Sequence, residues 1–117
     1  MALTKEQVLD KMKEKDAVVL NVLGEQAYQK SRIKGSFNIP WGGNPDAFVK
    51  AVEAKFGRNK FFITHCANYN CMAGPNAAKL LKSKGFRAED YPGGIEEWVA
   101  AGFPAEGSEV KKTAMTK

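Results

Sequence analysis

The sequence of 117 residues contains only two cysteines, one histidine and no apolar run long enough to cross a bilayer. A transmembrane helix needs about 20 consecutive apolar residues, and the N-terminus leads directly into a charged segment without the pattern of a signal peptide. Cys66 and Cys71 are too few and too close in sequence to staple a small secreted fold. We therefore expect a cytoplasmic protein with no membrane partner, in which a thiol does chemistry.

Negative charge is also scarce, because 18 lysines and arginines stand against 13 aspartates and glutamates, for a net charge of +5. A basic excess favours nucleic-acid binding when it gathers into one patch. Here the lysines are spread along segments with helical spacing, which is typical of solvated helix faces. We therefore expect no nucleic-acid partner.

The composition is that of one soluble globular domain, with 44% hydrophobic and 26% charged residues. A chain of this length is large enough to bury a core. We assign residues 1–105 to the domain. Residues 106–117 include too few apolar side chains to pack, so we expect a flexible C-terminal tail there.

Apolar periodicity predicts strands that alternate with helices. Apolar runs predict strands over 17–23 and 60–65, and we also expect a short strand over 86–91 and a brief strand before Pro40. Helical spacing predicts helices over 5–14, opened by a Thr4/Gln7 capping box, over 25–30, over 45–56, from Gly74 as N-cap and Pro75 onward, and from the turn at 92–94 to Gly102. This alternation predicts a small three-layer α/β sandwich, whose central parallel sheet has four to five strands and helices on both faces.

Cys66 directly follows the buried strand 60–65 and precedes a loop and a helix. Ligands of parallel sheets bind beyond the carboxyl ends of the strands. The free N–H groups of a helix start hold anions, and a cysteine near them has a lowered pKa. We therefore expect Cys66 to be an ionised nucleophile, cupped by main-chain amides and open to water. The alternative is a cysteine that only packs in the core.

Several short segments stand in an ordered series along the chain: 18–22, Tyr28 with 32–40, 64–66, 77–80 with 84–86, and the ending Gly93-Gly94-Ile95-x-x-Trp98-x-x-x-Gly102-x-Pro104. Together they resemble a single-domain rhodanese (sulfurtransferase) module over about residues 4 to 105. The Gly-Gly-Ile-x-x-Trp ending is the most specific part. The resemblance implies the rhodanese-like fold, in agreement with the sandwich predicted from the residues.

The resemblance also implies a reaction. Cys66 would take a sulfane sulfur from thiosulfate or from a low-molecular-weight or protein persulfide, and carry it as a persulfide to a thiol acceptor, such as a sulfur-relay protein. No cofactor or metal is implied, and the module would be a monomer or a weak homodimer. The cradle for the persulfide would be the active-site loop, made of Ala67, Asn68, Tyr69, Asn70, Cys71, Met72 and Ala73.

The chain has uncharged residues at several positions where the family usually has charged ones. Asn21 and Leu23 stand where the family usually has an Asp and an Arg, and the loop carries no cation for an anionic donor. Arg32 is our candidate for a cation on the substrate side. The same departures support an alternative, a catalytically weak or inactive module with a regulatory or protein-binding role.

Cys71 is a candidate resolving thiol, which would attack a persulfide or sulfenate on Cys66 and close a local disulfide. Its alternative role is to pack under Tyr69 or Met72. A phosphatase or arsenate reductase of the same fold also begins its loop with His-Cys, but here Met72 replaces the arginine that would bind phosphoryl oxygens. A metal site is not expected, since His65, Cys66 and Cys71 lack a fourth ligand and His65 faces the other side of its strand.

Overall fold

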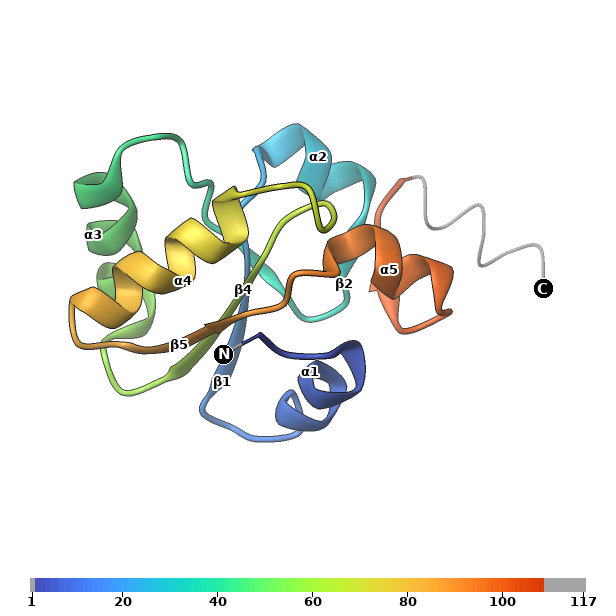
Figure 1. Cartoon of the computed structure of the whole chain (residues 1–117), viewed down its shortest axis with the longest axis horizontal. Coiled ribbons are helices and arrows are strands. Elements are labelled where there is room, and N and C mark those ends of the chain that lie inside the picture. Colours follow the sequence, from blue (N-terminus) through green and yellow to red (C-terminus); the bar gives the residue numbers. More distant parts are fainter. Residues whose placement is uncertain (1, 109–117) are drawn as a thin grey trace.

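The structure is a computed structural model that describes residues 2–108, and it shows an α/β fold with helices on both faces of a sheet (Figure 1). The helices are α1 (Lys5–Lys11), α2 (Glu25–Lys30), α3 (Pro45–Phe56), α4 (Ala73–Ser83) and α5 (Gly94–Ala100). The strands are β1 (Ala17–Asn21), β2 (Arg32–Ile33), β3 (Phe37–Asn38), β4 (Phe61–His65), β5 (Arg87–Asp90) and β6 (Ala105–Glu106).

The main sheet has four parallel strands in the order β3-β1-β4-β5. Strands β1 and β4 are central, and all but the first residue of each is buried, as continuous apolar runs require. Asn21 pairs with His65 at the carboxyl edge. The predicted three-layer sandwich with a parallel sheet is therefore confirmed, and Cys66 leaves a central strand at the edge where parallel sheets bind ligands.

The two faces of the sheet bury separate hydrophobic clusters. Alternate residues of a strand point to opposite faces, so Phe62 packs in the cluster under α3 and α4, while Ile63 packs in the cluster with Trp98 of α5. Cys66 belongs to the first cluster. The His65 ring lies on the other side, with its centroid 6.5 Å from that of Tyr91. Consecutive residues of β4 and its loop thus meet different environments.

The predicted tail begins too early, because Glu106 belongs to β6. This strand pairs antiparallel with β2, and Glu106 lies opposite Arg32. The preceding Pro104 is anchored as well, since its carbonyl accepts hydrogen bonds from the Trp98 indole at 2.6 Å and the Lys34 amide at 3.1 Å. Main-chain pairing therefore extends the fold beyond the last apolar residues. The rest of the predicted tail, 109–117, lies outside the described residues.

Helix ends differ from the expectation at two places. The Thr4/Gln7 capping box is confirmed, but α1 stops at Lys11 with Met12 as C-cap, since the amides of Lys13 and Glu14 bond three residues back as in a 3₁₀ turn. Helix α4 begins at Ala73 with Met72 as N-cap, so the assignment of Gly74 as cap and Pro75 as first helical residue was wrong. The Met72 carbonyl already accepts the Asn76 amide at 3.0 Å. Pro75 fits there because the first helical N–H groups have no intrahelical acceptor.

Candidate functional site

Cys66 is buried, with 3% of its surface exposed, and its sulfur forms a disulfide with Cys71. The two Cα atoms are 6.3 Å apart. Cys66 packs in the first cluster with Ala77, while Cys71 and Ala73 pack against that cluster. The expected ionised sulfur open to water is therefore not what this oxidised form shows. A nucleophile at Cys66 requires reduction of the disulfide.

A compact turn brings Cys71 back to Cys66. The Asn68 side-chain oxygen accepts the Asn70 amide at 2.9 Å, and the Asn68 carbonyl accepts the Cys71 amide at 3.2 Å. Asparagine is suited to this role because its side chain mimics a backbone turn. Asn68 thus sets the path of the uncharged loop between the two cysteines.

The first turn of α5 lies directly against the main chain of this loop. The Ile95 amide donates to the Cys66 carbonyl at 3.0 Å, and the Glu96 amide donates to the Ala67 carbonyl at 3.0 Å. Gly94 has a φ of 68°, and a Cβ there would lie 2.5 Å from the Cys66 carbonyl oxygen. Only glycine permits this approach. The Gly-Gly-Ile segment of the sequence is therefore a support for the active-site loop.

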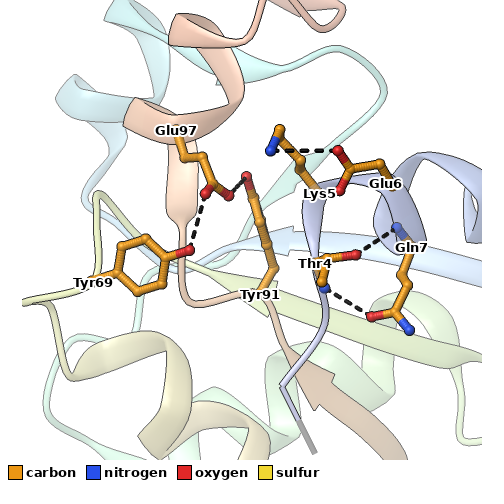
Figure 2. Close-up of polar contacts among 7 residues, drawn as sticks. All are labelled: Thr4, Lys5, Glu6, Gln7, Tyr69, Tyr91 and Glu97. Atoms are coloured by element: carbon orange, nitrogen blue, oxygen red, sulfur yellow. Dashed lines mark hydrogen bonds and ion pairs between the residues drawn. The ribbon is translucent and has the colours of Figure 1, made fainter.

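Two carboxylates of α5 also hold side chains of the loop. Asn68 donates to Glu96 at 2.9 Å, and the Tyr69 hydroxyl donates to Glu97 at 3.0 Å. The buried Tyr91 hydroxyl donates to the other oxygen of Glu97 at 2.8 Å, so Glu97 lies between two tyrosines (Figure 2). Sequence reasoning missed both glutamates, because acidic residues in the first turn of a helix are common without any site.

Both tyrosines keep their protons at neutral pH. The hydrogen bond to the Glu97 carboxylate raises the pKa of Tyr69 above its usual value. Burial, followed by the same carboxylate, raises the pKa of Tyr91. Loss of either proton would remove a hydrogen bond and place two negative charges together. Tyr69 is therefore a neutral donor in the loop.

His65 does not supply a positive charge beside Cys66. Its ring is fully buried, and burial lowers its pKa to about 4. Nδ1 lies 3.1 Å from the Cys66 carbonyl oxygen, and a neutral ring protonated at Nδ1 donates this bond. Among the described residues Nε2 has no partner. His65 acts on the site by positioning main chain, since it is neutral at physiological pH.

A buried chain of polar groups lies behind the start of α4. The Thr64 hydroxyl is 2.9 Å from the Gly74 carbonyl oxygen and 3.1 Å from the Asp90 carboxylate. Burial raises the pKa of Asp90 to about 6. The Gly74 carbonyl and the Asp90 carboxylate therefore share the one Thr64 hydroxyl proton, and the hydrogen bond from Thr64 partly offsets the effect of burial on the pKa of Asp90. Sequence reasoning missed this chain of polar groups, because Asp90 stands beside Glu89 in a strand with mostly charged residues and has no pattern that marks it as buried.

Arg32 contacts other parts of the fold. Its guanidinium donates to the Tyr28 carbonyl at 3.3 Å, lies over the Tyr28 ring and is 3.6 Å from the Glu106 carboxylate. None of these contacts involves Cys66 or the loop. The proposed role of Arg32 as a substrate-side cation stays a prediction without a contact to support it.

Asn21 occupies a buried position at the same edge of the sheet. Its side-chain oxygen accepts the Leu23 amide at 2.9 Å, and within the described chain its Nδ2 has no partner. Asn21, which stands where the family usually has an acidic residue, therefore stabilises a local turn through this hydrogen bond. It leaves no charge at the carboxyl end of β1.

Other features of the chain bear on partners. Within residues 2–108 no group of three or more His, Cys, Asp or Glu side chains is arranged to hold a metal ion. No helix in that range has the length and apolar content to cross a membrane. The expectations on cofactors, oligomeric state and cell compartment stay predictions.

Comparison with known protein families identifies the family of this chain. Residues 4–101 match the family model of the rhodanese-like domain. The chain belongs to the rhodanese-like family. Cys66, at the end of β4, occupies the position that the sequence resemblance gave to the persulfide-carrying cysteine of this family.

Solved structures share the rhodanese-like fold. A Bacillus halodurans protein is 24% identical, with a TM-score of 0.78 over 92% of this chain and 77% of that one. A rhodanese-related protein of Thermoplasma volcanium is 23% identical, with a TM-score of 0.73 over 90% of this chain and 96% of that one. At these identities the likeness shows the fold alone.

A curated relative is an HTH-type transcriptional regulator of Mycobacterium tuberculosis. It is 24% identical over 105 residues, which are 90% of this chain and 44% of that protein. The chain thus spans less than half the length of this relative.

We predict that Gly94→Ala weakens the fold more than an alanine at Gly102, which has a similar positive φ but nothing within 4 Å of its Cβ position. Alanine in the left-handed region costs about 1–2 kcal/mol, and we expect Gly102→Ala to lose that amount. Gly94→Ala should lose about 2 kcal/mol more, because its Cβ meets the fixed main chain of Cys66 and Ala67. Urea denaturation of both variants measures the difference. Equal losses would show that the loop accommodates a Cβ.

We predict that Asp90→Asn gains stability relative to the wild type as pH rises from 4.5 to 7.5. The raised pKa of Asp90 means that the folded state binds its proton more tightly than the unfolded state, so its contribution to stability is lost as pH rises through about 6. The amide has no proton to lose. Because Asp90 lines a surface depression with Pro75 and Lys79, we discount for solvent screening and expect about 1–2 kcal/mol.

Denaturant titrations at the two pH values measure this change. Asp16→Asn is the matched control, because a hydrogen bond from Arg87 lowers the pKa of Asp16. The difference between that variant and the wild type should stay the same at the two pH values, because the pKa of Asp16 lies below 4.5 in both the folded and the unfolded state. A parallel pH dependence of Asp90→Asn and the wild type would contradict the raised pKa of Asp90.

Proposed function

We propose that the reduced domain is a sulfurtransferase that carries a sulfane sulfur on Cys66. The Cys66 thiolate attacks the outer sulfur of a donor persulfide R–S–SH, the S–S bond of the donor breaks, and R–S⁻ leaves. With thiosulfate the leaving group is sulfite. An acceptor thiolate then attacks the outer sulfur of the Cys66 persulfide and regenerates the Cys66 thiolate. The observation that carries the proposal is the position of Cys66, directly after central strand β4 in a rhodanese-like domain.

The start of α4 supports a thiolate at this position. Gly74, in the first helical turn, lies so close to Cys66 that a Cβ on it would be 3.4 Å from the Cys66 main-chain nitrogen. The first N–H groups of an 11-residue helix have no intrahelical acceptors and carry partial positive charge. Since His65 is neutral and the loop is uncharged, main-chain groups are the main source of stabilisation for the anion.

The disulfide gives Cys71 a role in the same cycle. The Cys71 thiolate attacks the inner sulfur of the Cys66 persulfide, a Cys66–Cys71 bond forms and hydrosulfide leaves. A dithiol reductant then restores both thiols by disulfide exchange. The support for this resolving role is that the loop already places the two cysteines within bonding distance. Cys71 thus competes with an external acceptor for the bound sulfur.

A second candidate function is a regulatory or protein-binding module without turnover. Two observations favour it: Cys66 is buried in a disulfide, and the chain is similar to part of an HTH-type transcriptional regulator. In that case the state of the thiol pair, and not the transfer of sulfur, would be the signal. The two functions differ in whether donors load reduced Cys66.

We predict that a sulfane donor loads Cys66 of the reduced protein. Reduced wild type, Cys66→Ser and Cys71→Ser are each treated with thiosulfate, glutathione persulfide or a persulfidated peptide, and the mass gain of one sulfur atom is located by mass spectrometry. Cys71→Ser should gain the sulfur and keep it, Cys66→Ser should not gain it, and the wild type should hold it only until Cys71 releases it as hydrosulfide. If alkylating agents modify Cys66 but no donor loads it, the transferase proposal fails and the regulatory function is favoured.

We predict that Cys71 sets the lifetime of the persulfide. Without an acceptor, loaded wild type should release one hydrosulfide per chain and lose both free thiols as the disulfide closes. Loaded Cys71→Ser should release no hydrosulfide on that timescale and keep its persulfide. Sulfide release and thiol titration are followed together. Equal persulfide lifetimes in the two proteins would remove Cys71 from the reaction.

A further inference from the structure

The loop that carries Cys66 has no charge of its own, but α5 places two carboxylates on it. The Glu96 carboxylate accepts from the Asn68 side chain at 2.9 Å, while its amide bonds to the Ala67 carbonyl at 3.0 Å. Glu96 is therefore attached to the first two residues after Cys66 by both main chain and side chain. Its side chain is exposed, so the charge faces the solvent from which a donor arrives.

Glu97 is the second carboxylate and is held more rigidly. Its two oxygens accept hydroxyl protons from Tyr69 of the loop and from buried Tyr91, as Figure 2 shows. Tyr69 itself is 66% exposed. Glu97 thus has a fixed place between the core and an exposed side chain of the loop.

Few positive groups offset these charges near the loop. Lys5, at the start of α1, lines a depression with Tyr69 and Glu97, but its ammonium group is 3.4 Å from the Glu6 carboxylate, which offsets its charge (Figure 2). Lys79 lies two turns into α4, and Arg32 pairs with Glu106. His65 is neutral. A protein with a net charge of +5 therefore presents a negative rim beside its reactive cysteine.

We propose that Glu96 and Glu97 determine donor specificity. They select a persulfide carried in a basic segment of a peptide or protein, and they disfavour a small dianion such as thiosulfate. The inference rests on the sulfurtransferase function proposed above and names the class of its donor. The reaction is the transfer already described, in which the donor persulfide gives its outer sulfur to the Cys66 thiolate and leaves as a thiolate.

The physical reason is Coulombic repulsion or attraction at the solvent-exposed rim. A unit charge about 8–10 Å from a dianion in a high-dielectric setting changes binding by a factor of about five. Such an effect weakens when salt screens it, and the Debye length is about 3 Å at about 1 M salt. Measurements at low and high salt therefore separate the effect of charge on donor specificity from the effect of loop shape, which does not depend on salt.

The experiment measures kcat/KM of the reduced protein with three donors: thiosulfate, a cysteine-persulfide peptide flanked by arginines, and the same peptide flanked by glutamates. The variants are Glu96→Gln and Glu97→Gln. Glu53→Gln on α3 is the matched control, since it removes the same charge next to Arg58, and α3 lies at the other end of the molecule from α5 (Figure 1). Tyr69→Phe removes the hydrogen bond to Glu97 and leaves the charge.

We expect each of the two α5 substitutions to raise kcat/KM for thiosulfate and for the acidic peptide, and to lower it for the basic peptide. The ratio of basic peptide to thiosulfate should fall about five-fold or more per glutamate at low salt, and the differences should shrink at about 1 M salt. Glu53→Gln and Tyr69→Phe should keep the wild-type ratio, whatever their effect on the absolute rates.

Two outcomes overturn the inference. Donor ratios that stay at the wild-type value in both α5 variants, or that change equally at high salt, would show that the carboxylates position the loop without selecting the donor. These outcomes leave the sulfurtransferase function intact, since Cys66 would still load. If no donor loads reduced wild-type Cys66, the proposed function fails and the specificity fails with it.

Discussion

The close approach of α5 to the main chain around Cys66 is the constraint on which the site depends. The Ile95 amide bonds to the Cys66 carbonyl, and this distance is reached only because Gly94 has no side chain and a positive φ. The same helix fills the second cluster with Trp98, whose indole anchors the Pro104 carbonyl. Helix α5 therefore attaches the cysteine loop to the core, although Tyr69 and Met72 of the loop are exposed.

The buried polar side chains at the carboxyl edge of the sheet carry little charge. His65 is neutral, the Asn21 amide replaces an acid, and the pKa of Asp90 is raised to about 6. Each group makes hydrogen bonds to neighbouring main chain or side chains, and burial disfavours the charged forms of His65 and Asp90. The ions near the site are instead on α5, in contact with solvent. In the proposed sulfur transfer, the α5 carboxylates would select the donor at the surface, while main-chain groups around Cys66 would stabilise the thiolate.

The fold was predictable because its signals are local and repeated. The continuous apolar runs of β1 and β4 required burial on both faces, and the alternation with helices left a parallel sheet as the outcome. Cys66 followed from the strand before it. The contacts between α5 and the loop were not predictable, since Glu97 and Tyr69 are 28 residues apart and either residue alone is ordinary. The shielding of Cys66 was also missed, because it depends on how the Asn68 turn folds Cys71 back.

In the proposed reaction, the Cys66–Cys71 disulfide and the two α5 carboxylates would act on different steps. Closure of the disulfide removes the nucleophile from every donor alike, because Cys66 has no thiolate to offer. Under the proposed function, the α5 carboxylates would distinguish among donors only once the pair is reduced. A dithiol reductant must reach the same exposed face, next to Tyr69 and Met72, which are two of the three most exposed large apolar side chains described. Access for the reductant and access for the donor are therefore governed by the same surface, and a charge that favours a basic partner favours it for both steps.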